Sequence, residues 1–155
     1  MLAAMTDDEF VNRNRIELER LRALVTRLSD AQLGAPVNES WTVAGVLAHT
    51  AFWDGRARFL AGKLSRREPF TPSDDEPEDV DWINDAMRPL LHAIPHRQAA
   101  RLALAIAEAT DARMAELPPD LVARTWPMDE TSPLNPRRSL HRGEHLDEIE
   151  AALGT

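Results

Sequence analysis

Residues 138–150 have the sequence Arg138-Ser-Leu-His141-Arg-Gly-Glu-His145-Leu-Asp-Glu148-Ile-Glu150. Asn135 is a typical helix N-cap, and Pro136 is a typical first helical residue. We therefore predict a helix from about residue 136 to residue 153. On that helix His141 and His145 share one face, because residues four apart lie above one another.

Two imidazoles placed in this way can hold one divalent metal ion, because each neutral ring offers a nitrogen lone pair. Glu148 lies three residues beyond His145 on the same face, whereas Glu144 lies beside it. A His-x-x-x-His pair also occurs by chance, so two solvated histidines are the alternative interpretation.

A third histidine lies far upstream, in the stretch Trp41-Thr-Val-Ala-Gly-Val-Leu-Ala-His49-Thr-Ala-Phe-Trp53. Thr42 can cap a helix that runs to about Leu64, with Trp41 packed onto its first turn. Four residues share the face of His49: Val46, Trp53, Arg56 and Leu60. Because this face is largely apolar, His49 is expected to be buried, and each ring nitrogen then needs a partner. Metal, carboxylate and carbonyl remain open as partners, and for a lone histidine a hydrogen-bonded core residue is the preferred interpretation.

The remaining apolar pattern predicts further helices and no strand. A capping box at Thr6 and Glu9 starts a helix that ends near Leu28, with Asn14 on its apolar stripe. A short helix begins near Val80 and is disturbed by Pro89. A longer one follows over residues 95–117, and its predicted buried stripe is Ala99, Leu102, Ile106, Ala109 and Arg113. His92 and His96, separated by Pro95, are interpreted as surface histidines.

This pattern predicts an all-α fold: a four-helix bundle, up-and-down with a long crossover and one short extra helix. The 155 residues fit one domain, 1–155, and 43% of them are apolar, which is enough for a core without a structural metal. The absence of cysteine excludes zinc fingers, disulfide scaffolds and a thiol nucleophile from the protein itself.

The charge and hydropathy of the chain exclude several partners. A formal net charge of −8 argues against nucleic acid, and much of the excess lies in the acidic loop 73–81. No apolar run is long enough to span a bilayer, and no export signal is visible at the start of the sequence. We therefore expect a cytoplasmic protein with no membrane partner.

The two histidine stretches together resemble the DinB/YfiT-like superfamily, which includes the metal-binding domain of mycothiol-dependent maleylpyruvate isomerase and the bacillithiol transferases. The resemblance implies a DinB-like four-helix bundle, often a homodimer, with one divalent metal held by His49, His141 and His145. Some relatives use a glutamate in place of a late histidine, so Glu144 is an alternative ligand.

Three neutral imidazoles would leave open metal positions for water or substrate. The metal would be zinc or nickel, with iron or manganese as alternatives. Glu148 is the candidate acceptor for the second nitrogen of a ligand histidine, or a general base. Arg56 could meet an anionic substrate or form a salt bridge at the rim.

The function expected from this resemblance is a metal-dependent enzyme that acts on a small molecule, either an S-transferase or an isomerase with a low-molecular-weight thiol as cosubstrate. The alternatives are a non-catalytic metal-binding stress or interaction protein, a metal-dependent hydrolase, and a plain bundle whose histidines hold no metal.

Overall fold

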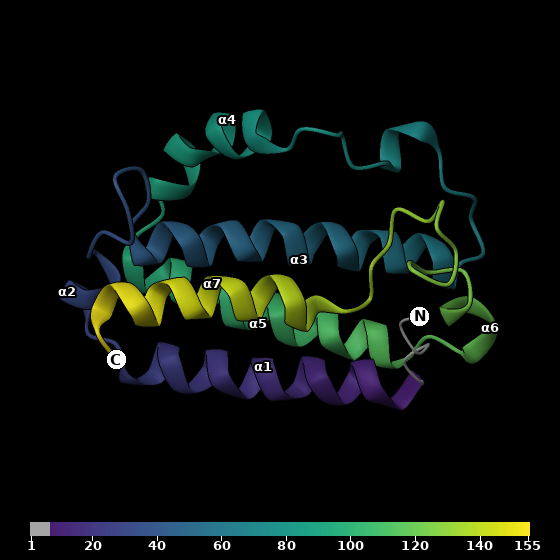
Figure 1. Ribbon diagram of the computed structural model, residues 1–155, viewed down its shortest axis with the longest axis horizontal. Coiled ribbons are helices and arrows are strands. Elements are labelled where there is room, and N and C mark those ends of the chain that lie inside the picture. The colour runs from purple at the N-terminus through teal and green to yellow at the C-terminus, as the bar shows by residue number, and fades with distance from the viewer. Residues whose placement is uncertain (1–6) are drawn as a thin grey trace.

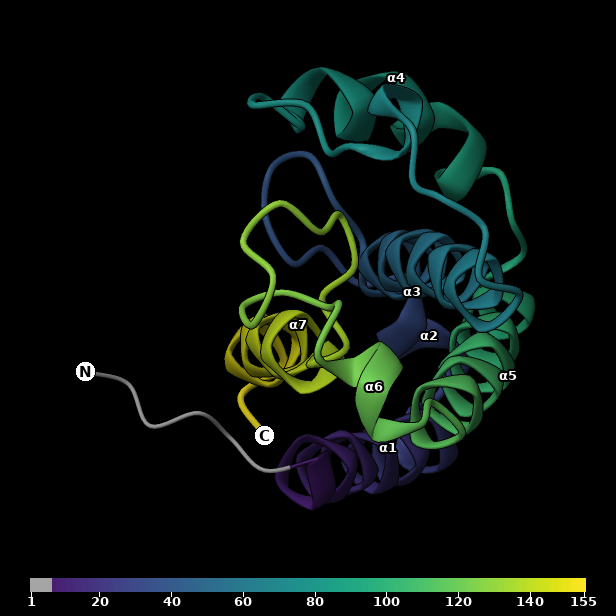
Figure 2. The ribbon, with the colours of Figure 1, turned by 90° about the vertical axis from the view of Figure 1, so that its right-hand side faces the viewer.

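The computed structural model describes residues 7–155, and four long helices form its body: α1 (Asp7–Arg27), α3 (Val43–Ser65), α5 (His96–Ala115) and α7 (Arg138–Leu153). They surround a common core in the order α1, α5, α3, α7 (Figure 2). The predicted all-α four-helix bundle is confirmed. Among the described residues the only β-type pairing is an isolated bridge between Pro36 and Thr42.

The long crossover leads from α3 to α5 and carries the short helix α4 (Asp81–His92), preceded by a 3-10 turn, η1 (Pro72–Asp74). It brings the chain back along the molecule, so that α3 and α5 run in the same direction (Figure 1). Within the described chain α4 packs mainly on α3 and lies outside the four-helix ring (Figure 2).

The helix α4 corrects one expectation, because it continues through Pro89 to His92. Proline removes one N–H donor from a helix. Pro89 is exposed, so water can satisfy the carbonyl that loses its partner. Two one-turn helices, α2 (Asp30–Leu33) and α6 (Pro119–Val122), were not predicted.

The buried face of α5 consists of small residues, which allow this helix to approach its neighbours closely. Ala99, Ala100, Ala103 and Ala107 are each at most 1% exposed. The predicted stripe was therefore wrong at Leu102, which is 39% exposed. Alanine rather than leucine faces the core here because the backbones leave room only for a methyl group.

A side chain of α1 caps the start of α7. The amide nitrogen of Asn14 donates to the Pro136 carbonyl at 2.8 Å, and its oxygen accepts from the Ser139 N–H at 2.9 Å. α7 begins at Arg138, so the predicted start at Pro136 was two residues early. The oxygen of Asn135 instead accepts from the N–H of Arg137 at 3.0 Å. The capping box predicted at Thr6 lies outside the described residues.

None of the helices in residues 7–155 combines the length and the apolar character that crossing a membrane requires.

Candidate metal centre

Three histidines from two helices meet inside the bundle. His49 comes from α3, while His141 and His145 come from successive turns of α7, which runs antiparallel to α3 (Figure 1). One ring nitrogen of each lies within 4.8 Å of the other two. The Nε2 atoms of His141 and His145 are 3.1 Å apart. The structure thus brings the upstream histidine to the C-terminal pair, which α7 alone could not do.

Burial keeps two of these rings neutral. Burial, together with a smaller contribution from the nearby His145, lowers the pKa of His49 to about 4 and that of His141 to about 2. Desolvation penalises the protonated, charged form of an imidazole. Near neutral pH both rings therefore have the lone pair that metal coordination requires.

The hydrogen bonding of the rings fits a bound cation. The Nδ1 atom of His145 lies 2.9 Å from Oε2 of Glu148. If that nitrogen carries the proton, the Nε2 lone pair of His145 points toward Nε2 of His141. Two lone pairs at 3.1 Å repel one another unless a proton or a metal ion lies between them. The donor set therefore suits a divalent ion.

The other two rings lack a comparable partner. The Nδ1 atoms of His49 and His141 are buried, and neither hydrogen-bonds to any described residue. Among these three histidines, only His145 has a hydrogen-bond partner for its Nδ1 atom, and this partner is the Glu148 carboxylate. Glu144 is exposed and lies outside the group of described side chains that could share one ion.

A buried ion-pair network supports the start of α7 and was missed in the sequence. Arg142 is 1% exposed and contacts Asp54 of α3 at 3.1 Å and Asp111 of α5 at 2.9 Å. Arg138 also binds Asp54, at 2.8 Å. Burial lowers the pKa of Arg142, but the hydrogen bonds that it donates to Asp111 and the charges of both carboxylates outweigh burial, so the pKa is raised overall. For Asp111, burial outweighs the pairing and raises the carboxyl pKa.

The sequence did contain a signal for this network. Arg142 falls at helical spacing between Ser139 and Leu146, and all three are buried. A charged residue on the buried stripe of a helix requires a partner of opposite charge inside the protein.

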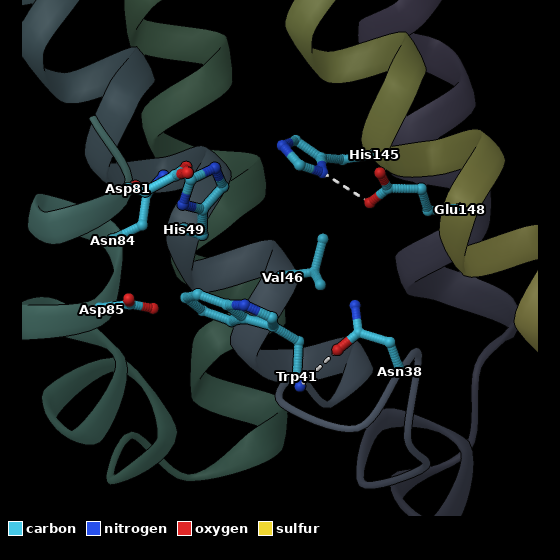
Figure 3. A pocket seen from close by; sticks show the side chains of 9 residues that line it. All are labelled: Asn38, Trp41, Val46, His49, Asp81, Asn84, Asp85, His145 and Glu148. Atoms are coloured by element: carbon cyan, nitrogen blue, oxygen red, sulfur yellow. Dashed lines mark hydrogen bonds and ion pairs between the residues drawn. The ribbon is translucent and has the colours of Figure 1, made fainter. Parts of the chain in front are cut away.

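Two cavities flank the histidines, with α4 as their outer wall. The first, of about 330 Å³, is called the acidic cavity (Figure 3). It is lined by Asn38, Trp41, Val46, His49, Asp81, Asn84, Asp85, His145 and Glu148. The second, of about 360 Å³, is called the arginine cavity because Arg56 and Arg138 line it. His49, Asn84 and His145 line both cavities, so the histidine cluster lies where the two meet.

Arg56 lies on the wall of the arginine cavity. Its guanidinium donates to the Asp74 carbonyl at 2.6 Å and lies 5.9 Å from the ring centre of Trp53. The nearest carboxylate in contact, that of Glu76, is 3.9 Å away. Burial lowers the pKa of Arg56. The salt bridge that was expected for Arg56 at the rim is thus formed with Glu76, at the long distance of 3.9 Å.

Comparison with known proteins identifies a family. The family described as the mycothiol maleylpyruvate isomerase N-terminal domain matches residues 15–147, which include all three histidines. No curated protein and no solved structure matches the chain significantly. Since the match covers most of the chain, this protein belongs to the mycothiol maleylpyruvate isomerase N-terminal domain family.

Proposed function

We propose that this protein is a divalent-metal-dependent enzyme that uses a low-molecular-weight thiol, either as an S-transferase or as an isomerase. One observation carries the proposal: three imidazoles, of which His49 and His141 have pKa values lowered by desolvation, converge where two cavities meet. The name of the matching family refers to a thiol, mycothiol, and to an isomerase, and this supports the proposal. The chain has no cysteine, so a reacting thiol must come from a cosubstrate.

His49, His141 and His145 would hold the metal, which we expect to be zinc or nickel, with iron or manganese as alternatives. A bound divalent ion would supply a Lewis acid that favours the thiolate form of a thiol or polarises a carbonyl. The three side chains would remain neutral and leave the ion its full charge.

Glu148 and Arg56 would take the remaining roles. Glu148 lies on the wall of the acidic cavity, and its carboxylate can accept the thiol proton. In the transfer reaction the sulfur then bonds to the electrophilic carbon, and the leaving group departs with the bonding electrons. In the isomerisation the sulfur adds to a conjugated double bond, and its elimination after rotation regenerates the thiol. Arg56 would position a negatively charged group of the substrate.

The first test is the metal content of protein purified without a histidine tag. We expect about one ion per chain, and loss of that ion in His49→Ala and His141→Ala. His96→Ala is the control, because His96 is exposed and lies outside the cluster. Unchanged metal content in the first two variants would show that the ligand assignment is wrong.

The second test is turnover. Metal-loaded protein should consume an electrophile such as a bimane reagent only when mycothiol, bacillithiol or glutathione is present, and the two variants should not. Metal binding without turnover would favour a non-catalytic metal-binding protein. Turnover without any thiol would favour a hydrolase. A cytoplasmic location and a homodimer remain predictions.

A further inference from the structure

The two cavities that meet at the histidines differ in charge. Three carboxylates line the acidic cavity, from Asp81, Asp85 and Glu148, and its lining includes no lysine or arginine. The arginine cavity is lined by two guanidinium groups and one carboxylate, that of Glu76. A charged ligand would therefore prefer one end of the site, because a partly desolvated cavity strengthens the field of its lining charges.

The guanidinium groups of the arginine cavity retain capacity for an anion. Arg138 binds Asp54 through Nε, and within residues 7–155 its two terminal nitrogens form no other hydrogen bond. Arg56 donates to the backbone carbonyls of Asp74 and Pro133, which are neutral. Guanidinium groups bind carboxylates through paired hydrogen bonds, so a carboxylate suits this cavity better than a neutral group does.

The acidic cavity offers the opposite chemistry. Asp81, Asn84 and Asp85 extend from α4 and face His145 and Glu148 of α7 across the opening (Figure 3). Asp85 is paired with Arg88 at 2.8 Å, and Glu148 with His145 at 2.9 Å. The carboxylate of Asp81 forms no hydrogen bond to any other described residue.

The lower wall of the same cavity is the indole ring of Trp41 (Figure 3). The guanidinium of Arg88 lies 5.8 Å from the centre of this ring, so Trp41 already has a cationic partner. The carboxylates of the cavity attract ammonium groups and hydrogen-bond donors, and they repel anions.

We propose that the two cavities are charge-sorted subsites for the two reactants. The arginine cavity takes an electrophile that carries a carboxylate. The acidic cavity takes the body of a thiol that carries hydrogen-bond donors and no negative charge. The two reactive atoms meet at the boundary that the cavities share, which is formed by His49, Asn84 and His145. This inference rests on the proposed function. Each cavity has the size of a small-molecule site.

The carboxylate subsite can be tested without metal or turnover. The probes are benzoate and its neutral analogue benzamide, and the readout is the indole N–H NMR signal of Trp53, which donates to Asn84 of the shared boundary at 3.1 Å. We expect benzoate to bind about fivefold tighter than benzamide, and Arg56→Gln and Arg138→Gln each to remove most of that preference. Arg66→Gln is the control, because its exposed side chain pairs with Glu68.

Arg138 also pairs with buried Asp54, so a melting curve must accompany that variant, and Arg56→Gln decides the question if Arg138→Gln unfolds. Equal binding of the two probes, or an unchanged preference in Arg56→Gln, would overturn the assignment.

The thiol subsite is tested on cobalt-loaded protein with two short thiols of opposite charge, cysteamine and 3-mercaptopropionate. The readout is the sulfur-to-cobalt absorption band. Cysteamine should bind about fivefold tighter, and the double variant Asp81→Asn/Asp85→Asn should reduce this preference to less than about twofold. The control is Glu116→Gln/Asp120→Asn, which removes the same charge from exposed positions.

The outcomes separate the two proposals. A protein that binds no cobalt contradicts the proposed function, while the benzoate experiment still tests the arginine cavity. A cobalt band without charge preference, or one whose preference survives Asp81→Asn/Asp85→Asn, contradicts only the charge-sorted thiol subsite.

Discussion

Arg142 shows at the level of a single residue what keeps the histidine helix in place. Its guanidinium is 1% exposed and bonded to Asp54 and Asp111, so α7 is tied to α3 and α5 one residue after His141. A buried charge is costly unless it is paired, and removing one partner leaves the other charge uncompensated. Arg142 therefore stabilises the position of His141, the candidate metal ligand that precedes it in the sequence.

We predict that Asp54→Asn lowers the free energy of unfolding by about 3 kcal/mol, because Arg138 and Arg142 lose the carboxylate that they share. Urea denaturation gives this value. Asp120→Asn is the matched control: its pair with Arg67 is exposed on both sides, so the loss should stay below about 1 kcal/mol. Similar losses in both variants would mean that the buried network adds no stability.

The histidines predict a pH dependence of stability in the metal-free protein. The pKa of His49 is lowered from 6.5 to about 4 on folding, so the unfolded chain binds more protons below pH 6.5. The free energy of unfolding should therefore be highest above this pH and fall as the pH drops toward 4. Each buried histidine contributes a slope of up to about 1.4 kcal/mol per pH unit.

Urea titrations in a chelator between about pH 7 and about pH 5 measure this slope, and in that range most carboxylates stay ionised. His49→Gln should reduce the slope of the free energy of unfolding against pH, whereas His96→Gln, at an exposed position, should leave it unchanged. An unchanged slope in His49→Gln would contradict the lowered pKa of His49.

At this scale the sequence predicted part of the histidine cluster. The spacing of His141 and His145 on one helix was sufficient to pair them. His49 was assigned to them only through the family resemblance, because helical periodicity fixes the face of a residue but not which distant helix it meets. Arg142 was missed because a lone arginine in sequence is usually a surface residue.

At the level of elements, α7 depends on a cap that comes from α1. The first N–H groups of a helix lack partners within it, and here Asn14 supplies one for Ser139 while it also donates to the Pro136 carbonyl. These two bonds fix where α7 begins, and therefore the height of His141 and His145 in the bundle.

Asn14→Ala should lower the free energy of unfolding by about 2 kcal/mol, because a buried cap and a buried carbonyl lose their partner. It should also weaken metal binding, measured by competition with a chelator. Asn12→Ala is the control, since Asn12 is exposed on the same helix and bonds only to Arg15 among the described residues. Unchanged metal affinity in Asn14→Ala would mean that the cap does not position the histidines.

Two glycines of α3 give a matched pair of substitutions. A Cβ atom on Gly45 would clash with Nε2 of His92, the last residue of α4, whose ring contacts Trp41 with centroids 5.3 Å apart. A Cβ atom on Gly55 would meet nothing closer than 4.0 Å. Alanine favours a helix over glycine by about 0.5–1 kcal/mol.

We therefore expect Gly55→Ala to stabilise the protein by about 0.5 kcal/mol. Gly45→Ala should instead displace the His92 ring and loosen α4. Hydrogen exchange over residues 81–92 measures this, and it should become faster in Gly45→Ala alone. Equal protection of α4 in both variants would show that the contact between His92 and α3 does not hold α4 in place.

The elements themselves were mostly predictable from periodicity, capping and prolines. The error in α5 came from treating leucine as the core residue. In this bundle the alanines mark the close approach of α5 to its neighbours, and the larger Leu102 is excluded to the surface. The error at Pro89 arose because the cost of a helical proline depends on whether water reaches the carbonyl it leaves free.

On the scale of the whole molecule, the bundle is a frame that holds histidines from α3 and α7 together, and α4 lies outside it (Figure 2). This position cannot be read from sequence periodicity, since it follows from how the long crossover returns over α3. Residues of α4 line both cavities, three of them in the acidic cavity and Asn84 in the arginine cavity.

An ion bound by His49, His141 and His145 would link α3 to α7, so metal should stabilise the entire bundle. A ligand at about one hundred times its dissociation constant adds about 2.7 kcal/mol to the folded state. For a chain of this length that corresponds to a melting temperature higher by about 5–10 °C. Calorimetry with zinc or nickel, against a chelator, measures the shift in each variant relative to its own metal-free form. His49→Ala should lose most of the shift and His96→Ala should keep it, because only His49 supplies the donor from α3. If His49→Ala responds to metal like the parent protein, the ion binds elsewhere and the three-histidine centre is not the site.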